Sequence, residues 1–331
     1  MAELDPSQAD GLVLRCGTRG SPLARAQGEL VRQLLAPHVG AWVVELVEIV
    51  TSADRQPDRP LREFGGKGLF VKEIEEALRE GRIDLAVHSA KDVPTTLPPG
   101  LVIAATPPRG APNDVWISRD GKSMADLPPG ALVGTSSPRR QAQVLALRPD
   151  LRVTAIRGNI QTRLRKVRDG VVEATLLAQA GLERSGLRPR PGHILPVEEF
   201  IPAGGQGALV LQTRGDDEVV RTLLEPIHDP IAAAALEFER GLIGALSGNC
   251  LSPIGVCALP RGQVNGKAQA GWIVRAFVGS LDGRRTARVA LLSEDATSAG
   301  LRALQPRLLE ALMQRGAKEI LEEIRASSGS V

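Results

Sequence analysis

Aromatic side chains are scarce in this sequence, and tyrosine is absent. Phe and Trp together make up 2% of the 331 residues, so the cores must be built from Ala, Val, Leu and Ile. Proteins that bind single-stranded nucleic acid without sequence preference stack the bases on aromatic side chains. We therefore expect no nucleic-acid partner.

Cysteine and histidine are too few and too scattered for a disulfide framework or a metal site. The three cysteines are Cys16, Cys250 and Cys257, and their odd number leaves at least one thiol free. Cys250 and Cys257 are too far apart for a close zinc-binding pair, and the four histidines are dispersed. We therefore expect no bound metal.

The sequence also lacks long apolar runs and a large excess of charge of one sign. No stretch approaches the roughly 20 apolar residues of a membrane span, and the polar, acidic residues 1–11 do not resemble a secretory signal. We expect a cytoplasmic protein with no membrane partner. The 41 basic and 38 acidic residues give a net charge of +3, so any attraction for anions must come from local clustering.

The sequence does contain a repeated alternation of strand and helix. Strands are predicted at residues 12–16, 41–50 and 83–88, and helices at 21–35 and 68–80. Beyond Pro- and Gly-rich stretches the pattern restarts, with strands predicted at 131–134, 152–156 and 174–178 and helices at 138–147 and 162–169. This βαβαβ order predicts two α/β domains, each with a mainly parallel sheet and covering helices.

The last third of the chain follows a different pattern. A strand at 208–212 and an Ala-rich helix at about 231–246 precede short strands at 254–258, 269–278 and 284–292, and a closing helix is expected from about 299 to 324. This order predicts a small, separate α+β domain.

Two strand-to-helix turns echo each other. Residues 17–22 and 134–138 both read Gly-Thr, then a Ser suited to cap a helix, then a Pro suited to its first position. Free N–H groups at helix N-termini attract anions, so both turns are candidate anion sites. The capping residues by themselves favour the alternative, that these are two ordinary helix caps.

Arginines gather at the same places. Arg19 lies in the first turn, Arg139 and Arg140 open the second helix, and Arg157 and Arg163 follow the next strand. Ligands of open α/β sheets lie at the carboxyl ends of strands, and arginine binds carboxylates or phosphates through two parallel hydrogen bonds. We favour a polyanion site over the alternative of a solvated basic surface.

Three further segments carry reactive or charged groups. Lys91-Asp92 follows a strand, where the carboxylate would stabilise a cation formed during a reaction or belong to a surface ion pair of little energetic value. Gly65-Gly66-Lys67-Gly68 lacks the full phosphate-loop pattern and is better interpreted as a flexible, lysine-bearing lid. Cys250 lies in a polar turn, where it is either a covalently used thiol or an idle one.

The order of these motifs resembles that of the porphobilinogen deaminases (hydroxymethylbilane synthases). The resemblance extends over nearly the whole chain after about Leu12, and a series of motifs is more specific than any one of them. The matching segments are residues 19–24, 65–70, 88–94, 134–141, 157–159 and 205–208, followed by Cys250 with Pro253-Ile254-Gly255.

The resemblance implies a fold and a domain division. The fold class is α/β, with two periplasmic-binding-protein-like α/β domains and a small α+β C-terminal domain. Domain 1 comprises residues 1–107 with 207–226, domain 2 residues 108–206, and domain 3 residues 227–331. The active site would lie in the cleft between domains 1 and 2, and domain 3 would carry one dipyrromethane cofactor, attached to Cys250 through a thioether.

The resemblance also implies roles for individual residues. Asp92 matches the catalytic aspartate. Besides Cys250, the residues contacting the cofactor would be Lys91, Asp92, Ser137, Arg139, Arg140, Arg163 and Arg184. Those contacting the substrate would be Arg19, Ser21, Arg157, Gln206, Lys67 and Phe70. Lys67 and Phe70 match a mobile loop, and Arg240 is a further match that rests on spacing.

The implied activity is that of a transferase of porphyrin biosynthesis. Four molecules of porphobilinogen would each lose ammonia and join head to tail on the two-ring primer, giving the linear tetrapyrrole hydroxymethylbilane. The small molecule porphobilinogen would be the partner of a monomeric enzyme. The competing interpretation is a non-catalytic anion receptor with an appended regulatory domain, since a fold does not imply a function.

Overall fold

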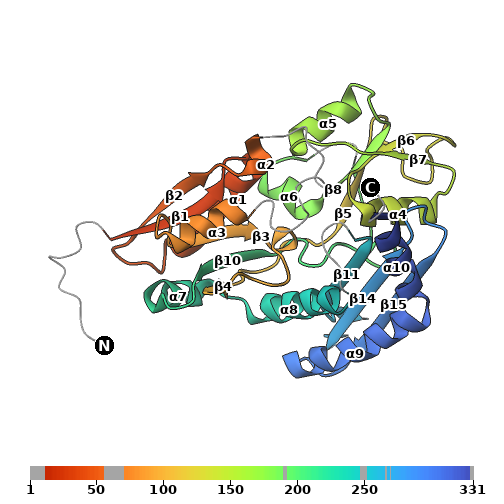
Figure 1. The fold of residues 1–331 in the computed structure, drawn as a ribbon. Coiled ribbons are helices and arrows are strands. Elements are labelled where there is room, and N and C mark those ends of the chain that lie inside the picture. Colours follow the sequence, from red (N-terminus) through yellow and green to blue (C-terminus); the bar gives the residue numbers. More distant parts are fainter. Residues whose placement is uncertain are drawn as a thin grey trace.

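The computed structural model describes residues 12–55, 71–188, 192–246, 252–264, 267–268 and 270–328. These residues form two five-stranded sheets, a three-stranded sheet and a two-stranded hairpin. In Figure 1 the first five-stranded sheet lies at the left, the second at the upper right, and the three-stranded sheet at the lower right. Within the described residues, no helix is long and apolar enough to cross a membrane.

The first sheet has the strand order β2-β1-β3-β10-β4. Its strands are β1 (Val13–Arg19), β2 (Val43–Ile49), β3 (Leu85–Ser89), β4 (Leu101–Ala105) and β10 (Leu209–Arg214). The helices joined to them are α1 (Pro22–Leu35), α2 (Ser52–Arg55), α3 (Lys72–Arg79) and α7 (Glu218–Leu224), and two 3-10 turns are η3 (Ala90–Asp92) and η4 (Glu225–Ile227). β1 runs parallel to β2 and β3, whereas β10 runs antiparallel to β3 and β4.

The second sheet repeats this arrangement, with the order β7-β6-β8-β5-β9. Its strands are β5 (Asp114–Ser118), β6 (Leu132–Gly134), β7 (Arg152–Thr154), β8 (Ala174–Ala178) and β9 (Gly192–Ile194), and its helices are α4 (Pro138–Leu147), α5 (Ile160–Arg168) and α6 (Gln179–Arg184). β6 runs parallel to β7 and β8, and β5 runs antiparallel to β8 and β9. Two α/β domains of one class are therefore confirmed.

The prediction of mainly parallel sheets holds for four of the five strands in each sheet, whereas β10 and β5 run antiparallel to both of their neighbours. The antiparallel strands β5 and β10 each follow a segment that crosses from the other sheet, at residues 106–113 and 195–208. A parallel neighbour needs a long crossover connection, usually a helix. Because these strands arrive directly from the other sheet, they enter without that helix and run the opposite way.

The third unit is α+β, as predicted. Its antiparallel sheet β11-β14-β15 is formed by β11 (Ile254–Pro260), β14 (Trp272–Gly279) and β15 (Thr286–Ser293), beside the hairpin of β12 (Gln263–Val264) and β13 (Lys267–Ala268). Its helices are α8 (Pro230–Ala245), α9 (Ser298–Gln314) and α10 (Ala317–Ser328). The expected single closing helix is wrong, because Gly316 has a φ of +84° that ends helical geometry between α9 and α10.

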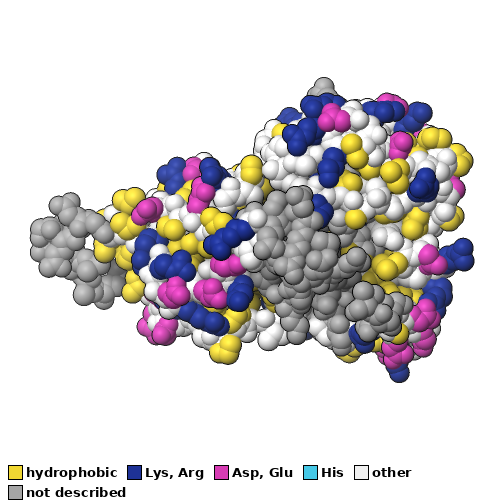
Figure 2. All heavy atoms as spheres, turned by 45° about the horizontal axis from the view of Figure 1, so that its top comes forward, with side chains coloured by type: hydrophobic (Ala, Val, Ile, Leu, Met, Phe, Trp, Pro, Cys, Tyr) yellow, Lys and Arg dark blue, Asp and Glu magenta, His cyan; other side chains and the backbone are white. Residues whose placement is uncertain are grey.

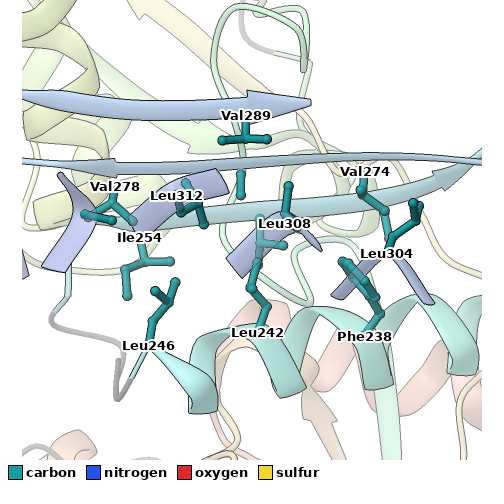
Figure 3. Packing of buried hydrophobic residues seen from close by; sticks show 14 of the residues in the cluster. Phe238, Leu242, Leu246, Ile254, Val274, Val278, Val289, Leu304, Leu308 and Leu312 are labelled. Carbon is teal, nitrogen blue, oxygen red and sulfur yellow. The ribbon is translucent and has the colours of Figure 1, made fainter. Parts of the chain in front are cut away.

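The core of this unit lies between the sheet and the helices α8 and α9. Figure 3 shows side chains from α8 and α9 converging on those of the sheet. On each helix the contributing residues are four positions apart, so they lie on the same face of that helix. The labelled residues are Phe238, Leu242, Leu246, Ile254, Val274, Val278, Val289, Leu304, Leu308 and Leu312. Burying a large apolar side chain contributes roughly 1.5–3 kcal/mol, so this core gives the unit a rigid frame.

Candidate functional site

Both predicted helix caps are present where the sequence places them. Ser21 Oγ accepts a hydrogen bond from Ala24 N at 3.3 Å, with Pro22 at the first helical position of α1. Ser137 Oγ accepts one from Arg140 N at 3.4 Å at the start of α4, which again begins with a proline. Each serine has extended backbone dihedrals, the conformation that a capping residue requires. Two helix N-termini with their free N–H groups are thereby fixed after β1 and β6.

A small pocket lies at the carboxyl ends of β1 and β3. Because these strands are parallel, their last residues share one edge of the sheet. β1 ends at Arg19, and β3 leads into η3, which carries half-buried Lys91 and exposed Asp92. The pocket is lined by Arg19, Ser21, Leu23, Ala24, Gln27, Val71, Val87, His88, Ser89 and Asp92. The structure thus brings together three of the predicted site residues of the first sheet.

The charges of the two sheets interact across this region. Burial lowers the pKa of Lys91 to about 8; Asp92 opposes this shift, and Arg140 from the second sheet adds to it. Burial likewise lowers the pKa of Arg163 to about 10, with further lowering by Arg140 and Arg157 and an opposing effect of Asp92. Shifted pKa values of this kind are typical of functional sites. Asp92 therefore lies within the electrostatic reach of basic groups from both sheets.

Charges on the molecular surface are mixed in sign, unlike the cluster of basic groups around Asp92. Figure 2 shows Lys and Arg side chains interspersed with Asp and Glu on the face that it draws. The described basic side chains of the predicted site are instead half-buried, as in Lys91 and Arg163, or buried, as in Arg139 and Arg140. Interactions among such desolvated groups are screened less by salt than those of exposed charges.

The arginine pair at the start of α4 forms a buried network around Asp114, the first residue of β5. Arg139 Nη1 donates to Asp114 Oδ2 at 2.8 Å, and Arg140 donates to Oδ1 through Nε at 3.0 Å and Nη2 at 2.6 Å. Gln206 Nε2 donates to the same Oδ1 at 3.1 Å. Asp114 is absent from the predicted site residues. The only local signal for it is an acidic residue directly before the apolar run Val115-Trp116-Ile117, a place where a charge needs partners.

Three buried polar atoms of the predicted site residues have no hydrogen-bond partner among the described residues. They belong to predicted ligands: Nε of Arg139, Nη1 of Arg157 and Oε1 of Gln206. An unpaired buried polar group is costly and unusual in a native protein. The two arginine donors are suited to an acidic ligand, whereas the glutamine oxygen is suited to a donor such as a pyrrole N–H.

Two further predicted arginines hold backbone carbonyl groups. Arg184 Nη2 donates to Gly207 O at 2.6 Å. Arg240, on α8, donates to Val93 O at 3.0 Å, to Pro94 O at 2.5 Å and to Thr95 O at 3.0 Å. The second set of contacts ties α8 to the segment that directly follows Lys91 and Asp92.

Three predicted site residues, Lys67, Phe70 and Cys250, lie outside the described residues. The other two cysteines are buried, and burial raises the pKa of Cys16 and of Cys257 to about 12, so both are poor nucleophiles at neutral pH. Among the residues with described positions, no group of three or more His, Cys, Asp or Glu side chains could hold a metal ion.

Comparisons with known proteins bear on the same residues. Residues 14–222 match the family described as "Porphobilinogen deaminase, dipyromethane cofactor binding domain". The chain belongs to the porphobilinogen deaminase family. The match includes every predicted site residue except Arg240 and Cys250.

Relatives in this family are similar over most of their length. The porphobilinogen deaminase of Syntrophobacter fumaroxidans is 45% identical over 313 residues, which are 94% of this chain and 98% of that protein. The porphobilinogen deaminase of Nitrobacter winogradskyi is 50% identical over 254 residues, or 76% of this chain and 80% of that protein. Among solved structures, the methionine-binding protein MetQ is 14% identical with a TM-score of 0.42, covering 68% of this chain and 93% of that chain.

Proposed function

We propose that this porphobilinogen deaminase family member is a transferase that joins four porphobilinogen molecules head to tail into hydroxymethylbilane on a covalently held dipyrromethane primer. The observation that carries the proposal is the position of Asp92. This carboxylate lines a pocket on the first sheet and interacts electrostatically with Lys91 beside it and with Arg163 of the second α/β unit. A negative charge in a basic cleft fits chemistry in which the ligands are acidic and the reacting centre becomes positive.

The basic residues are proposed to bind the carboxylates of the pyrroles. Porphobilinogen carries an acetate and a propionate, so each added ring brings two negative charges. A single arginine could not neutralise a growing chain, which explains why basic residues come from both sheets. The proposed cofactor contacts are Lys91, Asp92, Ser137, Arg139, Arg140, Arg163 and Arg184, and the proposed substrate contacts are Arg19, Ser21, Arg157, Gln206, Lys67 and Phe70.

The residues of the site fit a dipyrromethane group in their chemistry. The guanidinium atoms of Arg139 and Arg157 that lack a partner among the described residues would supply donors for its carboxylates, and Gln206 Oε1 would supply an acceptor for a pyrrole N–H. We propose that Cys250 holds the group through a thioether. When bound, the cofactor supplies a pyrrole with a free α-carbon that acts as the nucleophile.

Asp92 is proposed to act on the substrate ring. Loss of ammonia from the aminomethyl group leaves a cation that is delocalised over the pyrrole. The Asp92 carboxylate would accept the pyrrole N–H and stabilise that cation, and Lys91 beside it would help to hold ligand carboxylates. Positioned charges of this kind are worth more inside a site that excludes water.

Growth of the product requires space, and we propose that domains 1 and 2 move about the two crossing segments. The proposed domains are residues 1–107 with 207–226, 108–206, and 227–331. In support, the crossing segments touch at Gly110 N and Gly207 O, 3.1 Å apart, and Gly207 has a φ of +88° that other residues adopt rarely. Small-angle scattering should change as intermediates of increasing length accumulate; an unchanged curve and unchanged hydrogen exchange would refute the motion.

A turnover assay tests the function. Purified protein incubated with porphobilinogen should release ammonia and a linear tetrapyrrole. Asp92→Asn should keep the arginines and lower kcat by about 10²- to 10⁴-fold, the range for loss of a positioned acid, base or charge. Asp150→Asn, at an exposed ion pair with Arg148, is the matched control and should behave as the unmodified protein does. No turnover by the unmodified protein, or near-normal turnover by Asp92→Asn, would contradict the proposal.

We also propose that the enzyme works in the cytoplasm as a monomer and without nucleic acid. The proposed cofactor and substrate contacts are all supplied by this one chain, so the proposed site needs no residue from a second copy. Sedimentation at micromolar concentration should give a mass near 35.1 kDa. A larger species would refute the monomer.

A further inference from the structure

Asp114 is an acidic residue at the centre of a site whose ligands are expected to be acidic. It lies at the start of β5, directly after the first crossing segment, and its side chain is completely buried. Its two oxygens accept hydrogen bonds from Arg139, Arg140 and Gln206. All three partners are residues proposed to contact cofactor or substrate, so the hydrogen bonds of Asp114 link it to the site through these three side chains.

The carboxylate remains ionised inside the protein. Burial would raise the pKa of Asp114, but the charges and hydrogen bonds of Arg139 and Arg140 hold that pKa well below its usual range. One negative charge faces two positive charges, so the cluster retains an excess of one positive charge. A buried carboxylate with this many partners fixes the positions of the groups around it, since moving either guanidinium would leave a charge uncompensated.

The hydrogen bonds leave defined atoms for a ligand. Arg139 Nη1 donates to Asp114 and to Ile201 O, at 2.8 Å each, while Nε of the same guanidinium has no hydrogen-bond partner in the described part of the chain. Arg140 Nη1 donates to Leu176 O at 2.9 Å, and its other two nitrogens donate to Asp114. Both guanidinium groups are therefore held by the backbone and by Asp114 before any ligand arrives. Preorganised donors lower the entropic cost of binding.

The location of Asp114 also connects the arginines to the crossing segments. Gln206 lies on the second segment, and its Nε2 donates to Pro112 O on the first at 2.7 Å as well as to Asp114. β5 itself is buried along its length. Through Asp114, the arginine pair is thus connected by hydrogen bonds to the two crossing segments about which the domains are proposed to move.

We propose that Asp114 is a positioning residue that orients Arg139 and Arg140 to receive a carboxylate of the covalently held pyrrole chain. This inference rests on the proposed function, which supplies the ligand class. Asp114 does not contact the ligand. Its removal should weaken the hold on pyrrole carboxylates more than it slows the chemical step.

The test compares Asp114→Asn with Asp114→Glu and with the control Asp150→Asn. The first measurement is the fraction of each protein that carries the two-ring mass after incubation with porphobilinogen, read by intact-mass spectrometry. Asp114→Asn should lower that fraction and raise KM for porphobilinogen about tenfold or more, as expected for lost hydrogen bonds to charged groups, with a smaller change in kcat. Asp114→Glu keeps the charge that the fold requires but displaces it, so it should load the cofactor and still show a raised KM.

A double-mutant cycle separates positioning from a general loss of structure. Arg140→Met and Asp114→Asn should have strongly non-additive effects on KM, because each disables the same guanidinium group. Additive effects, or a KM in Asp114→Glu equal to that of the unmodified protein, would overturn the inference. If the unmodified protein gains no pyrrole mass, the proposed function itself fails. If it gains the mass and both Asp114 variants match it in loading and KM, the role of Asp114 alone fails.

Discussion

Replacing Glu239 by alanine removes a buried carboxylate that accepts four hydrogen bonds. Glu239, on α8, accepts from Arg109 Nη1 at 2.7 Å and Nη2 at 3.1 Å, from Gly205 N at 2.6 Å and from Ala258 N at 2.8 Å. Arg109 and Gly205 belong to the two crossing segments, and Ala258 belongs to β11. One carboxylate therefore joins both crossing segments to the third unit.

The magnitude follows from what the substitution leaves behind. Glu239→Ala leaves the Arg109 guanidinium buried without its counter-ion and two backbone N–H groups without their acceptor. Breaking a buried ion pair by removing one partner costs about 3–5 kcal/mol. For a chain of this size 1 kcal/mol lowers the Tm by roughly 2 °C, so we expect the Tm to fall by roughly 6–10 °C.

The assay is urea and thermal unfolding, with two comparison variants. Glu322→Ala removes one partner of an exposed ion pair with Lys318 on α10 and should cost less than about 1 kcal/mol. Arg109→Met combined with Glu239→Leu replaces both charges by apolar groups and should recover the part of the lost stability that comes from the uncompensated Arg109 charge, while the two backbone N–H groups stay without an acceptor. A Glu239→Ala protein that unfolds within about 1 kcal/mol of the unmodified protein would refute the reasoning.

Three other predictions concern single groups. Burial lowers the pKa of His88 to about 4, so between about pH 6.5 and 4 the unfolded chain binds a proton that the folded chain does not. The free energy of unfolding should therefore fall by up to about 3 kcal/mol as the pH drops through that window. A His88→Gln protein whose unfolding depends on pH as steeply as that of the unmodified protein would contradict this. Cys16 and Cys257 should resist alkylation in the folded protein, and peptide mapping after brief treatment with iodoacetamide that found either one modified would refute their burial. Arg240→Lys replaces the two guanidinium nitrogens that hold the segment after Asp92 by a single ammonium group, so kcat should fall while KM stays nearly constant; steady-state kinetics with an unchanged kcat would show that the contact is dispensable.

Local signals in the sequence predicted much of the fold. α4 and β8 have the predicted bounds, and the serine caps of α1 and α4 form as expected, because capping and apolar periodicity depend on residues close in sequence. β4, β5 and β9 are absent from the predicted strands. The partners of β4 and β5 are β10 and β8, which lie far away along the chain, and β9 in turn pairs with β5. Their assignment as strands therefore depends on pairing that short apolar runs in the local sequence do not reveal.

The same distinction applies to the site. The arginines after β1, β6 and β7 follow strand ends, so a general rule for α/β sheets predicts that they gather. Asp114 is separated from Arg139 by 25 residues and from Gln206 by 92, and nothing in the sequence pairs them. A buried carboxylate is recognised only when the fold shows which charges surround it.

The intact mass of the purified protein, with peptide mapping of the segment around Cys250, tests the central claim most directly. The claim is that this chain builds a tetrapyrrole on a primer that it carries itself. A mass excess equal to two linked pyrrole rings, located on Cys250 as purified or gained after addition of porphobilinogen, is the predicted result. A chain that remains unmodified after that addition and releases no tetrapyrrole would contradict the account and leave an anion receptor in its place.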